Sequence, residues 1–331
     1  MLKVSPAPHL REAQRPAYQS YGVLLCVAAL TFFSCFHYGL RPLLLVTIGT
    51  LTAVLTEVIC NLFHPTRSGI SDATSMVTGA LIGAMMSPLT PLWVPAIGTA
   101  FAIGVAKMPF GGSGRNIFNP AAAGVAFCTI CFPMRLFVYP DPTLTDSLPI
   151  LDTSSVITAI SPTAQLNSGG LTSYSWLSLV SGDIPAPIGS TGVLILIACA
   201  IYLFTRHSST PLVVLPYLAV CTLMAALFPR APIDPATSIS LELCTGLLLF
   251  SGVFLLSDPV TAPRFWLARI CYGVLAAILT MLLRHFGRPE FECLECFAVM
   301  LVNSFSPLLD RWCWIFVQFL RRKKAEVLSN V

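Results

Sequence analysis

The chain has 331 residues, of which 55% are hydrophobic and only 10% are charged, and its formal net charge is +4. Soluble domains carry about 25% charged residues, so this composition excludes a soluble globular domain and indicates an integral membrane protein. The basic residues are dispersed at expected helix ends and in a cluster near the C-terminus. This is a topology pattern, and it predicts no nucleic-acid partner.

Long apolar runs follow a polar N-terminal arm at residues 1–20, and each run is a candidate membrane span. A helix needs roughly 20 mostly apolar residues to cross a bilayer. About ten runs qualify, at 22–39, 42–63, 73–88, 91–109, 119–137, 189–205, 211–228, 239–257, 265–283 and 294–309. Several are short, so the third, eighth and tenth could be half-helices or re-entrant segments. A basic cytoplasmic tail is expected at 319–331.

The charges of the connecting segments predict an orientation with both termini in the cytoplasm, because Lys and Arg concentrate in the connections on that side. Residues 138–188 contain no Lys or Arg but several Asp, and we expect this polar loop outside the cytoplasm. It separates two halves, 21–137 and 189–318, with five expected spans each. An odd number per half forces an inverted orientation. The predicted fold is therefore an all-α integral membrane protein of two inverted repeats with broken or half helices.

Two distant stretches share the same order of features, which suggests that one copies the other. Each has a Thr-Gly pair, a Pro-flanked break after an apolar run, and a second Pro break before the next run: Thr78-Gly79, Ser87-Pro88 and Asn119-Pro120, then Thr245-Gly246, Asp258-Pro259 and Ser306-Pro307. Proline interrupts helical hydrogen bonding, and the freed carbonyls and half-helix ends can coordinate a cation or polar ligand.

The breaks predict a ligand or ion path inside the membrane, and Asn116, Asn119 and Asn303 are candidate ligand-binding residues at them. The alternative is hinge-like packing in which neighbouring helices satisfy the freed backbone groups.

Ionisable residues within apolar runs are the next candidates, because a charge inside a bilayer requires a partner or water. Glu57, Asp72 and Asp258 are candidates for an ion path, and for Glu57 and Asp258 structural pairing is an equal alternative. For Lys107 and Glu242 a buried pair or an interfacial position is the favoured interpretation.

No motif in the chain predicts a metal or a catalytic centre. The pairs Cys128/Cys131 and Cys293/Cys296 fall short of the four soft ligands that metal or iron–sulfur sites normally need, so we expect them to pack as apolar residues. The Gly-rich stretch at 111–114 lacks the Gly-Lys-Ser/Thr ending of a phosphate loop, and a tight turn is expected there. We expect no independent catalytic activity.

Several stretches together resemble the RnfD/NqrB family of membrane subunits of ion-translocating electron-transfer complexes, across nearly the whole chain. The stretches are SDATSMVTGAL at 71–81, IGTAFAIGVAK at 97–107, GGSGRNIFNPA at 111–121, IGST at 188–191, SDPVTAP at 257–263, and Asn303 with PLLDR at 307–311. The short N-terminal arm is similar to RnfD-type chains, since NqrB-type chains carry a longer one.

The resemblance implies a flavin mononucleotide (FMN) joined through its phosphate to a Thr on the outer side, at a motif close to Asp-Ala-Val-Ser/Thr-Gly-Ala-Thr-Pro-Leu. This chain reads TAISPTAQL at 158–166, so the motif Thr falls on Ala164 and Thr163 lies one place early. Phosphoester attachment needs an exposed hydroxyl on a flexible loop; Thr163 is the first candidate and Ser161 the second. Pro162 restricts the backbone here. The alternatives are an ordinary Ser/Thr-rich turn, a lost covalent flavin, or a non-covalent one; riboflavin is a further candidate.

By this resemblance we expect an RnfD-type chain in the cell (inner) membrane, as the D subunit of a complex that also contains the A, B, C, E and G subunits. Such a complex transfers electrons between reduced ferredoxin and NAD⁺ and couples this to Na⁺ or H⁺ movement, so the chain would be part of an ion-translocating oxidoreductase. The alternatives are a non-redox inverted-repeat channel or transporter, and a structural subunit without its covalent flavin.

Overall fold

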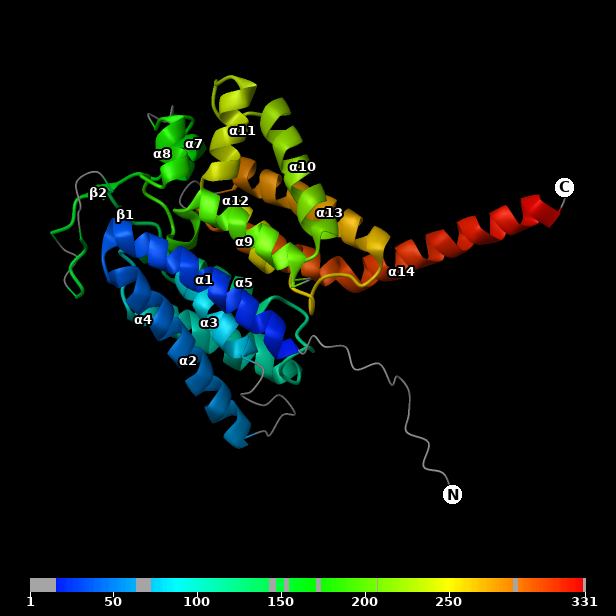
Figure 1. The fold of residues 1–331 in the computed structure, drawn as a ribbon, viewed down its shortest axis with the longest axis horizontal. Coiled ribbons are helices and arrows are strands. Elements are labelled where there is room, and N and C mark those ends of the chain that lie inside the picture. Colours follow the sequence, from blue (N-terminus) through cyan, green and yellow to red (C-terminus); the bar gives the residue numbers. More distant parts are fainter. Residues whose placement is uncertain are drawn as a thin grey trace.

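Apolar runs form two long helices at the start of the described chain. The computed structural model describes residues 16–63, 73–142, 147–151, 155–170, 174–206, 208–287 and 291–329. Helices α1 (Pro16–Tyr38) and α2 (Arg41–Phe63) are joined by Gly39, whose φ of +72° suits a glycine because it has no Cβ. This tight turn packs α1 and α2 against each other (Figure 1).

The other helices of the first half are shorter or irregular. α3 (Thr74–Ala84) ends in an irregular segment at 85–92, which contains Pro88 and confirms the expected break there. α4 (Trp93–Phe101) continues through a π-helical turn (Ala102–Lys107) and a 3-10 turn (Met108–Phe110). α5 (Pro120–Cys131) begins at the expected Asn119-Pro120 break, and α6 (Pro133–Leu136) follows.

The segment between the halves has only short elements in its described part. β1 (Tyr139–Pro140) pairs antiparallel with β2 (Thr158–Ala159). α7 (Pro162–Asn167), α8 (Trp176–Ser181) and a 3-10 turn (Ile188–Ser190) follow. The Tyr38 hydroxyl at the end of α1 donates to the Ile184 carbonyl at 3.0 Å, which fastens this segment to the first half.

The second half contains the most strongly bent helix. Its elements are α9 (Val193–Thr205), α10 (Pro211–Leu227), α11 (Pro235–Cys244), α12 (Leu248–Phe250) with a π-helical turn (Ser251–Leu255), α13 (Trp266–Phe286) and α14 (Leu294–Ser329). The segments 235–244 and 248–255 meet at an angle of 62°. An irregular stretch at 256–265, which contains Asp258-Pro259, confirms the second expected break.

The helices are consistent with a multi-pass, all-α membrane protein. Within the described residues, four helices are long and apolar enough to cross a bilayer, or five if the bent pair α11–α12 counts as one span. Each of the ten expected ranges contains a helix, but several are only 11–13 residues long. The number of ten spans and the inverted relation of the halves therefore stay predictions.

The two halves pack side by side, with α5 against α14 and α1 against α9 (Figure 1). We call the end where α1 begins the arm end, and the end that carries α7 and α8 the loop end. α14 runs beyond the bundle as one helix, although Pro307 lies within it. The break expected at Asn303 and Pro307 is therefore wrong.

Candidate functional site

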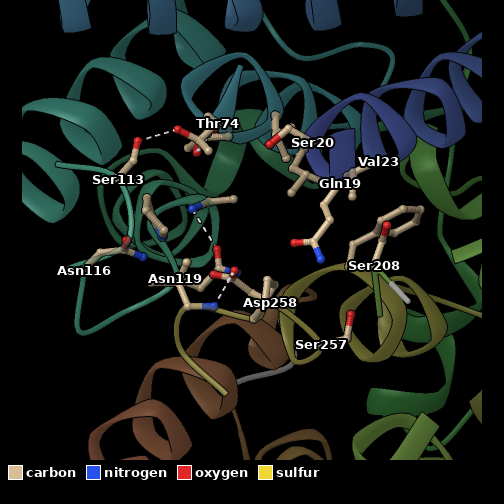
Figure 2. A pocket seen from close by; sticks show the side chains of 18 of the residues that line it. Gln19, Ser20, Val23, Thr74, Ser113, Asn116, Asn119, Ser208, Ser257 and Asp258 are labelled. Carbon is tan, nitrogen blue, oxygen red and sulfur yellow. Dashed lines mark hydrogen bonds between the residues drawn. The ribbon is translucent and has the colours of Figure 1, made fainter. Parts of the chain in front are cut away.

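A cavity of about 150 Å³ lies between the two halves at the arm end (Figure 2). Its apolar wall comes from α1, α3 and the π-helical turn after α12: Val23, Val77, Leu81, Val253 and Phe254. Its polar lining comes from both halves: Gln19, Ser20, Thr74, Ser113, Asn116, Asn119, Ser208, Ser257 and Asp258. Apolar walls with a few convergent polar groups are typical of a small-molecule site.

Lys107 lines the cavity and forms a buried ion pair with Glu57. Its Nζ donates to Glu57 Oε1 at 3.4 Å, to Thr74 Oγ1 at 2.9 Å, and to Ser75 Oγ. The Lys107 and Glu57 side chains are 3% and 6% exposed. Thr74 in turn shares a hydrogen bond of 2.6 Å with Ser113 on the cavity lining. The structure therefore shows the structural pairing that is one of the two alternatives for Glu57. An ion-path role for Glu57 stays a prediction.

The three candidate Asn residues have different positions. Asn119 is the N-cap of α5: its Oδ1 accepts from Ala121 N at 3.0 Å, and its Nδ2 donates to the Leu255 carbonyl at 3.1 Å. It therefore bonds the first half to the second. Asn116 lines the same cavity and donates to the Phe118 carbonyl at 3.1 Å. Asn303 does not line the cavity; it is buried on α14 and accepts from the Tyr272 hydroxyl.

The structure describes one of the two remaining acidic candidates, Asp258. Asp258 lines the cavity, and its carboxylate accepts from Val260 N at 3.1 Å and from Thr261 Oγ1 at 3.4 Å. These bonds stabilise the irregular connection before α13. Asp72 lies outside the described residues.

A second buried polar cluster lies at the loop end. Arg284 of α13 donates from Nε to Glu295 Oε1 and from Nη1 to Glu242 Oε2, both at 2.7 Å. Arg230 donates to Glu242 Oε1 and to Asn167 Oδ1 of α7. The four charged side chains of this Arg–Glu cluster (Arg230, Glu242, Arg284, Glu295) are at most 4% exposed. Of the two interpretations favoured for Glu242, a buried pair or an interfacial position, the structure shows the buried pair.

Sequence reasoning misses the other members of this cluster. Arg230 and Arg284 fall in connections between the expected spans, just after 228 and 283, and Glu295 is not singled out. Their position at the ends of apolar runs is equally typical of interfacial residues. Only the packing of α13 against both α10 and α14 brings these charges together.

Glu292, just before α14, is another residue that the sequence did not identify. It is 6% exposed, and its Oε2 accepts from Ser161 Oγ at 2.7 Å. Burial raises the pKa of Glu292 to about 7, although its hydrogen bonds with Ser161 and Tyr139 oppose this rise. The carboxyl group is therefore largely protonated below neutral pH.

Ser161 and Thr163 do not lie on the exposed, flexible loop that the attachment chemistry requires. Ser161 is the N-cap of α7, where its Oγ accepts from Ala164 N at 3.0 Å. Ser161 and Thr163 are only 3% and 2% exposed, and within the described part of the chain Thr163 Oγ1 has no hydrogen-bond partner. The expectation of an accessible hydroxyl is wrong at both positions, because that face of α7 packs against the second half.

Comparison with known proteins identifies the class of the chain. A profile of the NQR2, RnfD, RnfE family matches residues 3–315, and the chain belongs to this family. The chain is 26% identical to the D subunit of an ion-translocating oxidoreductase complex from Shewanella sediminis, over 94% of this chain and 96% of that protein. It is also similar to the D subunits of two ferredoxin:NAD(+) oxidoreductase complexes. One, from Acetobacterium woodii, is Na(+)-translocating and 27% identical over 94% of this chain and 93% of that protein. The other, from Clostridium ljungdahlii, is proton-translocating and 24% identical over 94% of each.

The attachment motif and the cavity at the arm end differ in how well their residues suit a flavin. At Thr163 the hydroxyl is buried, and the adjoining hollow at Asn167, Arg230 and Arg284 has a volume of only about 60 Å³. These residues do not fit a covalently attached flavin. The cavity at the arm end has apolar walls for a ring system, and amide, hydroxyl and carboxylate groups for its polar edge. These residues fit a non-covalently bound flavin.

Proposed function

We propose that this chain is the membrane-embedded D subunit of an ion-translocating ferredoxin:NAD⁺ oxidoreductase complex of the Rnf type. The observation that carries the proposal is the family match over residues 3–315. The complex would lie in the cell membrane and also contain the A, B, C, E and G subunits, with both termini of this chain in the cytoplasm. The proposal includes ten spans in two inverted repeats. An irregular break after an apolar helix in each half, at 85–92 and 256–265, supports it.

The proposal includes a flavin, FMN or riboflavin, bound without a covalent bond in the cavity at the arm end. Asn116 and Asp258 would hold the polar edge of its ring system, while Phe254 and the other apolar wall residues would exclude water. A bound flavin accepts and donates electrons one or two at a time. The protein contributes position and electrostatics: Lys107 lines the cavity, where it pairs with Glu57 and also donates to Thr74 and Ser75.

The proposed ion path uses Asp258, Glu57 and Asp72. Asp258 supports this role because it lines the cavity and, among the described residues, its carboxylate oxygens accept from a backbone N–H and a hydroxyl but form no ion pair. Na⁺ or H⁺ would pass near carboxylates at the breaks, where freed backbone carbonyls add further oxygen ligands.

The proposal is tested by purifying the tagged chain from membranes in mild detergent. We expect the other subunits to co-purify, and acid precipitation to release flavin into the supernatant, where chromatography measures it. Ser208→Phe should fill the cavity and lower the released flavin well below that of the parent chain, since Ser208 is 8% exposed and lines it. Leu215→Phe is the control, because Leu215 lies on α10 and is 59% exposed.

Two outcomes would contradict the proposal. A chain that purifies alone, binds no flavin and conducts solute in proteoliposomes is a channel or transporter. A complex that retains full flavin after Ser208→Phe holds the flavin elsewhere.

A further inference from the structure

The residues at the expected attachment motif form a capped helix. Ser161 caps α7 by accepting from Ala164 N at 3.0 Å, and Pro162 occupies the first helical position, where no backbone N–H is needed. The same Ser161 hydroxyl donates to Glu292 Oε2 at 2.7 Å. Both hydrogen-bonding directions of this hydroxyl are therefore used within the fold.

The Thr163 hydroxyl points into the protein, against the break between α11 and α12. Gly246 lies directly beneath it: a Cβ added there would be 3.0 Å from Thr163 Oγ1 and 2.7 Å from Arg284 Nη2. Thr163 is 2% exposed, and Oγ1 has no hydrogen-bond partner among the residues that the structure describes. A phosphoester at Oγ1 would have to occupy space that the backbone of Gly246 and the guanidinium of Arg284 already fill.

The far end of α7 is also fastened to the second half. Asn167, its last residue, accepts from Arg230 Nη1, and Arg230 donates to Glu242 of α11 as well. α7 is thus bonded at its start to the connection before α14 and at its end to the Arg–Glu cluster. Leu166, between these ties, is 2% exposed and packs in an apolar group with Leu241 and Cys244 of α11.

We infer that α7 is a structural plug over the α11–α12 break, and that Ser161 and Thr163 of this chain carry no flavin. The inference rests on the proposed function, which it deepens by leaving the cavity at the arm end as the place where the chain holds its flavin. The departures from the attachment motif agree with it: Pro162 starts a helix, and Ala164 has no hydroxyl.

The first experiment measures the covalent state of the full chain, isolated with its complex from the cells that make it. After denaturing electrophoresis the band should show no flavin fluorescence, and the intact polypeptide should have its unmodified mass. A fluorescent band that Thr163→Val or Ser161→Ala abolishes would overturn the inference.

The second experiment uses the unpartnered hydroxyl. Thr163→Val keeps the shape of the side chain and removes a buried group without a hydrogen bond, so the melting temperature should stay the same or rise. Electron transfer by the complex should be unchanged. A loss of electron transfer with an unchanged melting temperature would assign Thr163 to the redox machinery and overturn the inference.

The third experiment tests the plug itself. Ser161→Ala removes the cap and the bond to Glu292 and should lower the melting temperature clearly. Ser168→Ala is the matched control, because Ser168 is an exposed serine at the other end of α7 whose hydroxyl bonds only to the Gln165 carbonyl. Equal melting temperatures for both variants would overturn the plug. The band fluorescence, the mass of the polypeptide and the melting temperatures do not depend on the partner subunits, so failure of the proposed function would appear separately, as loss of co-purification and of released flavin.

Discussion

The two Thr-Gly pairs have the same sequence and opposite effects on the backbone. Gly79 lies inside α3, where it lets α3 approach α2: a Cβ there would lie 2.3 Å from the Gly49 carbonyl oxygen. Gly246 instead ends α11 with a φ of +66°, the left-handed conformation common just after a helix. Arg284 Nη2 donates to the Thr245 carbonyl, at 3.1 Å, beside this end. The same dipeptide thus serves close helix packing in one half and a break in the other.

The two Pro breaks that follow differ in the same way. Asn119 accepts hydrogen bonds from Ala121 N and Ala122 N, so Pro120 begins a new helix with its cap in place. Pro307 has no such cap before it, and α14 continues through it. At these two positions the difference lies in the cap: Asn119 satisfies backbone N–H groups that the start of α5 exposes, whereas the backbone of α14 is continuous at Pro307.

The largest expected effect tests the break in the second half. Arg284→Leu should leave the Glu295 carboxylate buried without its cation and Glu242 with Arg230 alone, and lower the free energy of unfolding by about 3–5 kcal/mol. Thermal unfolding in detergent measures the loss. Lys107→Met is the counterpart in the first half and should cost less, because it strands only Glu57. Equal losses of unfolding free energy in the two variants would mean that the second half depends no more on its buried charges than the first half does.

The next prediction concerns how stability depends on pH, and it comes from Glu292 in the second half. Glu292 has a folded pKa of about 7 against an ordinary value of 4.5, so the folded state binds its proton more tightly than the unfolded state. This difference in pKa contributes about 3 kcal/mol to the free energy of unfolding. The contribution is fully present below pH 4.5 and is lost as the pH rises to 7. Glu292→Gln imitates the protonated form, so its melting temperature should exceed that of the parent at pH 8. A parallel pH dependence in both proteins would contradict this.

The glycines themselves give the third comparison. Gly79→Ala should destabilise by about 1–3 kcal/mol, because the overlap is with the backbone of Gly49 and α2 must move away. Gly246→Ala should cost about 1–2 kcal/mol through its left-handed backbone, with Arg284 shifting to make room. Gly114→Ala isolates the backbone cost, since Gly114 has φ +83° and open space around it. A larger loss at Gly114 than at Gly79 would refute the close-packing account.

The smallest effect compares the two caps. Asn119→Ala should cost about 1 kcal/mol by removing the α5 cap, and it also removes the bond to the Leu255 carbonyl between the halves. Ser306→Ala, in the middle of α14, should change the melting temperature little. If Ser306→Ala lowered the melting temperature as much as Asn119→Ala, Ser306 would be acting as a helix cap before Pro307, against this interpretation.

The amino-acid sequence alone determined the membrane class, the position of most helices and the breaks at Pro88, Pro120 and Asp258-Pro259. These follow from local physics: apolar runs long enough for a bilayer form helices, and proline removes a backbone donor. The matched stretches also indicated the family, which the profile match over residues 3–315 confirms.

Only the tertiary structure decided which charges are paired and which hydroxyls are reachable. Lys107 meets Glu57 across 50 positions of sequence, and Ser161 meets Glu292 across 131. Burial of Thr163 likewise depends on Gly246 and Arg284, which lie far from it in the chain. The physical reason is that desolvation and pairing depend on which helices pack together, and no local pattern records the neighbours a side chain will meet.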